Sequence, residues 1–336
     1  MRESIVGRFA PSPSGRMHLG NVLCALLSWL SARSKNGGYI LRIEDLDAMR
    51  CPRPFAERII DDLKWLGLDW DGINEQNPGA ARYAEALAAL PEPVRRSAYQ
   101  SDRTPVYEYF EGILRKKGLL YPCFCSRAEL HAANAPHRSD GRVVYSGKCR
   151  NLTPEEAAAR RRKRGAAMRV RVPDETIISF DDGCMGPYTE DLAAECGDFI
   201  IRRSDGVFAY QLAVTVDDSL MGVTEVVRGN DLIGSTARQI WLHRLFGFRP
   251  PVFYHMPLLL APDGRRLSKR DEDLDLGLLR TRMPPERLIG ALAFAAGLID
   301  RDEAVSAREL VRGFSWDKIP RTDLFLPARF TGMQNL

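Results

Sequence analysis

The chain has 336 residues, of which 45% are hydrophobic, 27% charged and 9% aromatic. These are the proportions of an ordinary globular protein, and they exclude a largely disordered or low-complexity chain. The 48 Lys and Arg residues against 44 Asp and Glu residues give a net charge of +4, a mild excess that permits a nucleic-acid partner without requiring one.

Membrane and secretion signals are also excluded. The longest nearly apolar run, 288–299, is shorter than the roughly 20 residues that cross a bilayer. Arg8, Pro11 and Pro13 interrupt the early apolar residues, so we expect no secretory signal. The seven cysteines are odd in number and thinly spread, which argues against a disulfide framework and for a reducing compartment. We therefore expect a cytoplasmic protein.

The first part of the chain has the pattern of a parallel α/β sheet. The apolar segment 5–9 predicts a short buried strand, and apolar residues at helical spacing predict a helix over 20–35. Segment 38–44 is the next predicted strand, and a second helix is expected over 54–67. The order strand, helix, strand, helix is typical of parallel sheets.

The remainder has a less regular pattern. Segment 122–153 holds three of the seven cysteines and no long period, which indicates a small inserted module. Beyond it we predict a hairpin over 199–218 that turns at 204–206, a helix over 235–247 and a strand over 252–260. A last helix is expected over 285–298.

The basic run 160–164 (RRRKR) allows two interpretations. Thr153 is a good helix N-cap and Pro154 suits the first helical position, so the run falls near a helix C-terminus, where basic side chains are favoured. This structural interpretation is preferred, and contact with RNA stays open as the alternative.

The turn 11–21 (PSPSGRMHLGN) between the first strand and helix is the first segment that suggests chemistry. A helix N-terminus presents free backbone N–H groups and a partial positive charge, which suit a phosphate. Gly15 and Gly20 allow close approach to the backbone, and His18 can donate a hydrogen bond to a phosphate oxygen. The glycine spacing matches neither the P-loop nor the dinucleotide motif.

A second such segment is 265–270 (RRLSKR), which follows a turn at Asp263 and Gly264. A loop that carries Lys and Arg can close over a triphosphate and stabilise charge in a transition state. Alone, it could equally be a solvated basic loop. The early turn and the late Ser-Lys loop together are far more specific than either one.

Six short segments occur in the order of the signatures of a known family: 8–15 (RFAPSPSG), 18–21 (HLGN), 41–47 (LRIEDLD), 210–214 (YQLAV), 227–231 (VRGND) and 267–269 (LSK). On these segments most of the chain resembles the class I glutamyl-tRNA synthetases, and within them the glutamyl-queuosine tRNA(Asp) synthetase branch. Two positions depart from the family pattern: Asn21 ends the "HIGH" segment, and the "KMSKS" segment runs from Arg266 to Arg270. Because Asn can still donate a hydrogen bond and Arg266 keeps the positive charge, ATP binding remains the expectation.

The resemblance implies an α/β fold: a Rossmann-like class I aminoacyl-tRNA synthetase catalytic domain with a small zinc-containing insertion and a short helical C-terminal part. The implied divisions are the first half of the catalytic domain (1–105), the inserted acceptor-type module with the zinc site (106–198), the second half with the Ser-Lys loop (199–275) and the helical C-terminal region (276–336). A monomer is expected.

The implied reaction is ATP-dependent activation of L-glutamate to glutamyl-adenylate, with Mg²⁺ entering together with ATP. By resemblance, His18 and Lys269 are the catalytic residues. The implied ATP-binding residues are His18, Gly20, Asn21, Ser268 and Lys269.

Glutamate, with two carboxylates and one ammonium, requires cations and an anion in its site. Arg8 and Arg228 offer bidentate donors, Glu44 can hold the ammonium, and Tyr210 supplies a hydroxyl. Each alone could be a routine ion pair or a core tyrosine, and the ordered match favours binding. By resemblance, the glutamate-binding residues are Arg8, Phe9, Ala10, Pro11, Ser12, Glu44, Tyr210 and Arg228.

Cys123, Cys125 and Cys149 suggest a structural zinc that needs a fourth ligand. A histidine is the default fourth ligand, and His131 and His137 lie between them. The family's sites of this kind use a tyrosine, and Tyr145 stands four residues before Cys149, so Tyr145 is preferred with His137 as the alternative. Three reduced thiols without a metal are the remaining reading.

The expected acceptor follows from the length of the chain after Lys269, which is 67 residues (336 − 269). Enzymes of the family that charge tRNA(Glu) carry a helical anticodon-binding domain there, and this segment is too short for one. The resemblance therefore implies transfer of glutamate to queuosine in the anticodon of tRNA(Asp). The alternatives are a tRNA(Glu)-charging synthetase, a related nucleotidyltransferase acting on a small metabolite, and a non-catalytic ATP or RNA sensor.

Overall fold

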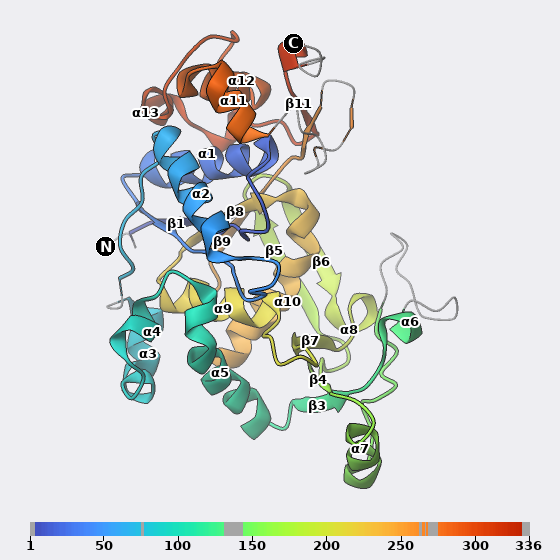
Figure 1. Cartoon of the computed structure of the whole chain (residues 1–336). Helices are drawn as coiled ribbons and strands as arrows, with labels where there is room; N and C mark the ends of the chain where they lie inside the picture. Colours follow the sequence, from blue (N-terminus) through green and yellow to red (C-terminus); the bar gives the residue numbers. More distant parts are fainter. Residues whose placement is uncertain are drawn as a thin grey trace.

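The structure is a computed structural model that describes residues 4–74, 77–130, 144–261, 264–265, 267 and 275–330. Its centre is a set of parallel strands (Figure 1). Strand β1 (Val6–Phe9) pairs with β2 (Gly38–Leu41), and β8 (Glu225–Gly229) pairs with β9 (Val252–Met256). The two pairs meet where the Thr224 backbone N–H donates to the Val6 carbonyl at 2.9 Å. The strand predicted over 5–9 is thus confirmed, and the one predicted over 38–44 is present but ends at Leu41. Segment 252–260 holds two strands, β9 and β10 (Leu259–Leu260), where one was predicted.

Helix α1 (Leu19–Arg33) is the hydrophobic centre of this half of the molecule. Eleven of its fifteen residues are buried, because it packs on β1, β2 and β8 and is covered from outside by the C-terminal helices (Figure 1). Its apolar residues share one core cluster with Leu288, Ile289 and Leu292 of α12 (Pro285–Ala295). Helices α1 and α12 lie where the sequence predicts them.

The prediction for segment 199–218 is half wrong. Strand β7 (Phe199–Arg202) and the turn are present, and Gly206 adopts φ +89° with its N–H donating to the Arg203 carbonyl at 3.0 Å. The second arm, however, is helix α9 (Tyr210–Leu220). Its Val and Thr residues favour a strand by propensity, but all positions from 211 to 220 are buried between α5 (Thr104–Lys116), α10 (Ile233–Phe246) and β7. Tertiary packing therefore overrides local propensity.

The middle of the chain forms a small antiparallel module. Strands β3 (Leu120–Cys123), β4 (Ala167–Val170) and β7 make one sheet in that order, and β5 (Ile177–Asp182) pairs with β6 (Gly186–Asp191). Helix α7 (Pro154–Arg161) lies at the end of the module farthest from the C-terminal helices (Figure 1).

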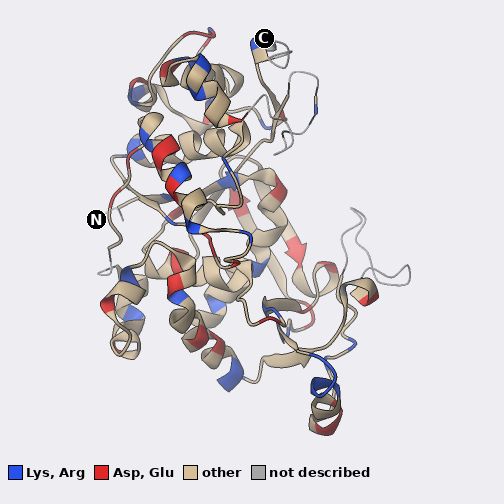
Figure 2. Cartoon of the chain, viewed as in Figure 1, with Lys and Arg blue, Asp and Glu red and all other residues tan. Residues whose placement is uncertain are grey.

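The cap of α7 agrees with the structural interpretation of the basic run. The Thr153 hydroxyl accepts from the Glu156 N–H at 3.2 Å, and the Glu156 carboxylate accepts from the Thr153 N–H at 2.9 Å. Acidic residues occupy its first turn and basic residues follow its last turn, as Figure 2 shows. This arrangement complements the helix dipole.

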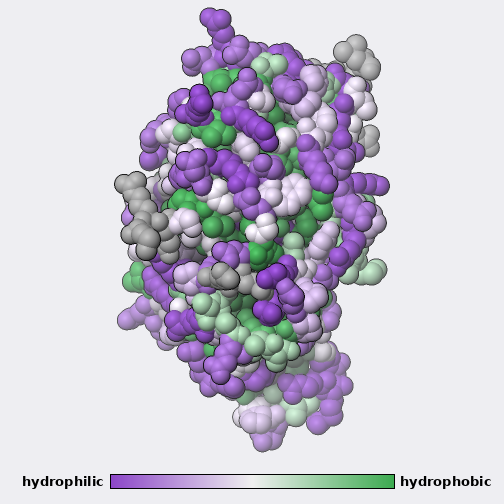
Figure 3. All heavy atoms as spheres, turned by 90° about the vertical axis from the view of Figure 1, so that its left-hand side faces the viewer, coloured by the Kyte–Doolittle hydropathy of each residue, from purple (hydrophilic) through white to green (hydrophobic). Residues whose placement is uncertain are grey.

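The remaining α-helices and β-strands complete the fold. They are α2 (Arg53–Trp65), α3 (Pro78–Leu87), α4 (Glu92–Arg96), α6 (Arg127–Leu130), α8 (Leu192–Glu195), α11 (Leu276–Arg282), α13 (Ala307–Leu310) and β11 (Leu324–Phe325). Among the described residues, no helix combines the length and the apolar character that a bilayer crossing needs. The face in Figure 3 is largely hydrophilic, with hydrophobic atoms in scattered groups.

Candidate active site

A cavity of about 790 Å³ opens beyond the carboxyl ends of β1 and β2. This is the edge at which open α/β sheets bind their ligands. Its lining includes three of the residues predicted to bind glutamate, Ser12, Glu44 and Tyr210. The full lining is Ser12, Ser14, Glu44, Leu46, Asp47, Arg50, Cys51, Gln100, Arg203, Val207, Phe208, Ala209 and Tyr210.

The start of α1 is built by the residues predicted to bind ATP. His18 is the N-cap, and its backbone N–H lies 3.4 Å from the Asn21 Oδ1, while the Asn21 N–H donates to the His18 carbonyl at 2.9 Å. Asn21, the departure from the family pattern, therefore closes the first turn of the helix as a polar capping partner.

Gly20 lies directly against the imidazole of His18. A Cβ at this position would lie 3.0 Å from His18 Cε1 and 3.1 Å from Nδ1, tighter than nearly all real Cβ contacts. The glycine thus allows the ring to lie against the first turn of α1.

Gly20→Ala is expected to displace the His18 ring and lower the rate of adenylate formation about tenfold, because small misplacements of reacting groups are costly. Stability should not fall, since Ala is a better helix residue than Gly. Gly112→Ala in α5 is the matched control: a Cβ there meets nothing within 4 Å, so it should gain about 0.5–1 kcal/mol in stability and keep its rate. Pyrophosphate exchange and thermal unfolding measure both, and an unchanged rate in Gly20→Ala would contradict the placement.

The Ser-Lys loop is described only at its ends. Ser268 and Lys269, together with the departures Arg266 and Arg270, lie outside the described residues. Asp275, the first described residue after the loop, forms an antiparallel bridge with His18 and caps α11. The C-terminal end of the loop is therefore anchored beside the start of α1.

Arg8 lies behind the cavity and is 4% exposed. Its Nη1 donates to the Val227 carbonyl at 2.9 Å, and its Nε lies 3.6 Å from Asp218 Oδ1. Its chain neighbours Phe9 and Pro11 are buried, and their carbonyls accept from the N–H groups of 42 and 44 at 2.9 Å. These residues and the partly buried Ala10 thus lie behind the cavity and do not line it.

Glu44 is held by a buried network of charges that sequence reasoning did not identify as a site. Its Oε1 accepts from Arg42 Nη2 at 3.2 Å, and Arg42 Nη1 donates to Asp218 Oδ1 at 2.6 Å. Burial raises the pKa of Glu44. Burial alone would also raise the pKa of Asp218, but Arg42 and Arg8 bring it below its usual value. Glu44 lines the cavity, and the positive charge of Arg42 beside it opposes the effect of burial.

Tyr210 lines the cavity, and the buried Arg228 lies behind it. The Tyr210 hydroxyl, at the start of α9, accepts from Arg228 Nη1 at 3.1 Å, which leaves the hydroxyl hydrogen for another acceptor. Arg228 is 4% exposed and donates to three further groups, which the sequence did not suggest. These are His255 Nε2 at 3.0 Å, Gln239 Oε1 at 2.8 Å and Thr236 Oγ1 at 2.6 Å.

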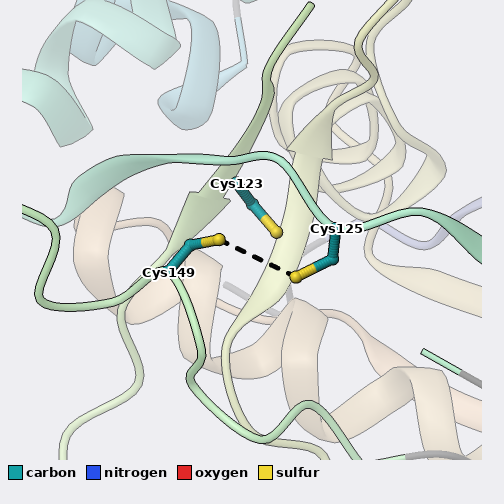
Figure 4. Close-up of side chains that lie close together, drawn as sticks. All are labelled: Cys123, Cys125 and Cys149. Carbon is teal, nitrogen blue, oxygen red and sulfur yellow. Dashed lines mark hydrogen bonds between the residues drawn. The ribbon is translucent and has the colours of Figure 1, made fainter. Parts of the chain in front are cut away.

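The three cysteines predicted to bind a metal come together between β3 and the loop before α7 (Figure 4). The sulfur atoms of Cys123, Cys125 and Cys149 lie within 4.8 Å of one another, and that of Cys125 is 3.7 Å from that of Cys149. The Tyr145 hydroxyl lies 3.5 Å from Cys123 Sγ and accepts from the Cys149 N–H at 2.8 Å. The alternative ligand, His137, lies outside the described residues.

These distances fit a tetrahedral metal. With zinc–sulfur bonds of about 2.3 Å, two sulfur ligands of one ion lie about 3.8 Å apart, and an oxygen ligand lies about 3.5 Å from a sulfur. Arg160 Nη1 also lies 3.7 Å from Cys149 Sγ, so one residue of the basic run contacts the cluster.

The sequence and the fold both have close relatives among known proteins. The family model "tRNA synthetases class I (E and Q), catalytic domain" matches residues 4–317. Proteins named glutamyl-Q tRNA(Asp) synthetase from Symbiobacterium thermophilum and Nitratidesulfovibrio vulgaris are 46% and 43% identical, and each match covers 96% of both chains.

Solved structures agree with this match. The glutamate-tRNA synthetase of Elizabethkingia anophelis superposes with a TM-score of 0.78 at 28% identity, covering 98% of this chain and 69% of that one. A glutamate tRNA ligase from Elizabethkingia meningosepticum, solved in complex with its amino acid, gives 0.77 at 27% identity and covers 98% and 68%. With an α/β catalytic domain and its cavity at the carboxyl ends of parallel strands, the chain belongs to the class I tRNA synthetases of the E and Q type.

Proposed function

We propose that this protein activates L-glutamate with ATP and transfers it to queuosine in the anticodon of tRNA(Asp). The observation that carries the proposal is the match, over 96% of both chains, to relatives named glutamyl-Q tRNA(Asp) synthetase. The glutamate-tRNA synthetase structure, by contrast, is covered to only 69% of its length. The chain therefore shares nearly the whole extent of the first group and about two thirds of the second.

In the activation step, the ATP phosphates would lie at the start of α1, where free N–H groups and the helix dipole favour anions. Gly20 and Asn21 shape this turn, and His18 donates a hydrogen bond to the α-phosphate. Lys269, next to Ser268, would bring a second positive charge from the loop anchored at Asp275. The glutamate α-carboxylate attacks the α-phosphorus, the bond from that phosphorus to the bridging oxygen breaks, and pyrophosphate leaves. Mg²⁺ that enters with ATP would balance part of the phosphate charge.

The glutamate would occupy the cavity between Glu44 and Tyr210. Glu44, held by Arg42, accepts from the ammonium group, while Arg228 and Tyr210 donate to a carboxylate. Arg8 adds positive charge from behind the wall, and Ser12 offers a hydroxyl at the cavity surface. Phe9, Ala10 and Pro11 would support the site from behind Ser12.

In the transfer step, a hydroxyl of the acceptor attacks the activated carbonyl carbon, and AMP leaves. The cyclopentenediol of queuosine carries cis-hydroxyls like those of a terminal ribose, so one active-site geometry could serve either acceptor. A tRNA(Glu)-charging enzyme is therefore the competing function. A non-catalytic sensor is disfavoured because the glutamate-site side chains are already held in place by the network around Arg42 and Arg228.

ATP–pyrophosphate exchange separates these functions at the first step. Exchange that requires glutamate supports the proposed activation. Absence of glutamate-dependent exchange, with or without added tRNA, would leave the sensor and the nucleotidyltransferase that acts on another metabolite. Transfer of labelled glutamate into RNA then identifies the acceptor.

We also propose a structural zinc at Cys123, Cys125, Tyr145 and Cys149, within an inserted module that spans about 106–198. Four protein ligands leave no open position for water, so the ion would stabilise the fold and take no part in the chemistry. The geometry of the three sulfur atoms and the Tyr145 hydroxyl supports this set.

Protein purified without chelator is expected to contain about one zinc per chain by metal analysis. Cys123→Ser should lose the metal, and Cys196→Ser, which lies outside the cluster, should keep it. Tyr145→Phe should weaken zinc binding. If His137→Ala loses zinc and Tyr145→Phe keeps it, His137 is the fourth ligand in place of Tyr145. A zinc-free preparation that is folded and fully active would refute the site.

A further inference from the structure

A chain of buried polar groups runs behind Arg228 and ends at Asp182. His255 on β9 accepts from Arg228 through Nε2 at 3.0 Å, and its Nδ1 lies 2.6 Å from Asp182 Oδ2. His255 is fully buried and Asp182 is 4% exposed, so no water screens these contacts. The three side chains come from β5, β8 and β9.

The hydrogen-bond directions leave one protonation state for His255. A guanidinium has donors only, so the Nε2 facing Arg228 must accept and the single ring proton must sit on Nδ1. That proton points at Asp182, whose Oδ1 is in turn fixed by the N–H groups of Cys184 at 3.0 Å and Met185 at 2.8 Å. The Thr236 hydroxyl lies 3.1 Å from the same Nε2.

The surroundings favour a neutral imidazole and a charged carboxylate. Burial lowers the pKa of His255, and the nearby Arg228 acts in the same direction. Burial opposes ionisation of Asp182, but its hydrogen bond with His255 brings its pKa below the usual value. The pair thus presents a fixed acceptor, and no positive charge, to Arg228.

Counting donors shows what Arg228 has left for a ligand. A guanidinium carries five N–H groups. The acceptors His255, Tyr210, Gln239 and Thr236 take four of them, which leaves one N–H on Nη2 without an acceptor among the described residues. That N–H and the Tyr210 hydroxyl hydrogen are two donors from adjacent groups, a pair that suits the two oxygens of one carboxylate.

We propose that His255 and Asp182 are positioning residues for amino-acid binding: they fix the plane of the Arg228 guanidinium, so that its last N–H and the Tyr210 hydroxyl meet one carboxylate of the substrate. This inference rests on the proposed activation of glutamate and adds two residues to its site. Of these four residues only Tyr210 lines the cavity, and Arg228 contacts it directly, so His255 and Asp182 act through Arg228.

Two substitutions separate positioning from a purely structural role. His255→Asn retains a donor near the Nδ1 position, and so the link to Asp182, but is too short to accept from Arg228. His255→Gln reaches the Nε2 position and can accept from Arg228, but loses the donor to Asp182. The matched control is His243→Asn on α10, since His243 is equally buried and its Nδ1 contacts Ser219 Oγ at 3.0 Å.

Glutamate-dependent pyrophosphate exchange is measured for each variant, with thermal unfolding as the check on the fold. The KM for glutamate should rise about tenfold or more in His255→Asn and less in His255→Gln, with the KM for ATP within about twofold of wild type in both. Control His243→Asn should keep both KM values. The positioning role would be overturned by an unchanged glutamate KM in His255→Asn, or by a larger rise of this KM in His255→Gln than in His255→Asn. Either result would leave the proposed function standing. A wild-type protein that neither exchanges nor binds glutamate would overturn the proposed function and this inference with it.

Discussion

Replacing Arg228 with alanine is expected to raise the KM for glutamate in pyrophosphate exchange about 100-fold. The residue is 4% exposed and is the guanidinium that contacts Tyr210 at the cavity wall. Without it, a substrate carboxylate is buried with no cation, and an unsatisfied charged hydrogen-bond partner costs about 1.5–3 kcal/mol. The KM for ATP should change little, because the phosphates lie at the start of α1.

Arg228→Lys tests whether charge or geometry matters. Lysine keeps the charge but cannot hold His255, Gln239, Thr236 and Tyr210 in one plane, so it should restore only part of the affinity. Arg115→Ala on α5 is the control, since Arg115 pairs with Glu111 and neither residue lines the cavity. A normal glutamate KM in Arg228→Ala would remove Arg228 from the site.

The second large effect is expected from Lys269→Ala, which should lower the kcat of exchange about 100-fold to 1,000-fold while the fold is retained. The lysine would stabilise charge that develops on the α-phosphate, and such donors typically contribute this much. This expectation rests on the Leu-Ser-Lys segment at 267–269 and on Asp275, which follows it and forms a bridge with His18.

The control for Lys269 is Lys163→Ala, an exposed lysine of the basic run after α7 that should leave exchange unchanged. Lys269→Arg should recover part of the rate, because it restores the charge with a different shape. Near-normal exchange by Lys269→Ala would exclude the loop from the chemistry.

The parallel strands and α1 could be predicted from the sequence because their signals are local. The short apolar strand β1 ends at Phe9, two residues before Pro11, and α1 carries apolar residues at helical spacing before its end at Arg33. The cap of α7 was equally local, since Thr153 and Glu156 are three residues apart. Helix α9 was missed because its helical form depends on packing against elements that are distant in sequence. Local propensity carries no information about these contacts.

The candidate site divides in the same way. The residues predicted to bind glutamate lie in segments that match family signatures, such as Glu44 in 41–47 and Tyr210 in 210–214. The groups that orient them are non-local: His255 follows Arg228 by 27 residues on a neighbouring strand, and Asp218 follows Arg42 by 176. Nothing in their own segments marks them, because their role depends on which strands the fold places side by side.

The measurement that tests the account most directly is transfer of labelled glutamate into purified RNA in the presence of ATP. The account predicts that label enters tRNA(Asp) that contains queuosine and enters neither tRNA(Glu) nor tRNA(Asp) from cells unable to make queuosine. Because the two tRNA(Asp) preparations share every contact except the modified base, they isolate the cyclopentenediol as the acceptor. Equal labelling of tRNA(Asp) with and without queuosine, or labelling of tRNA(Glu) in place of tRNA(Asp), would contradict it.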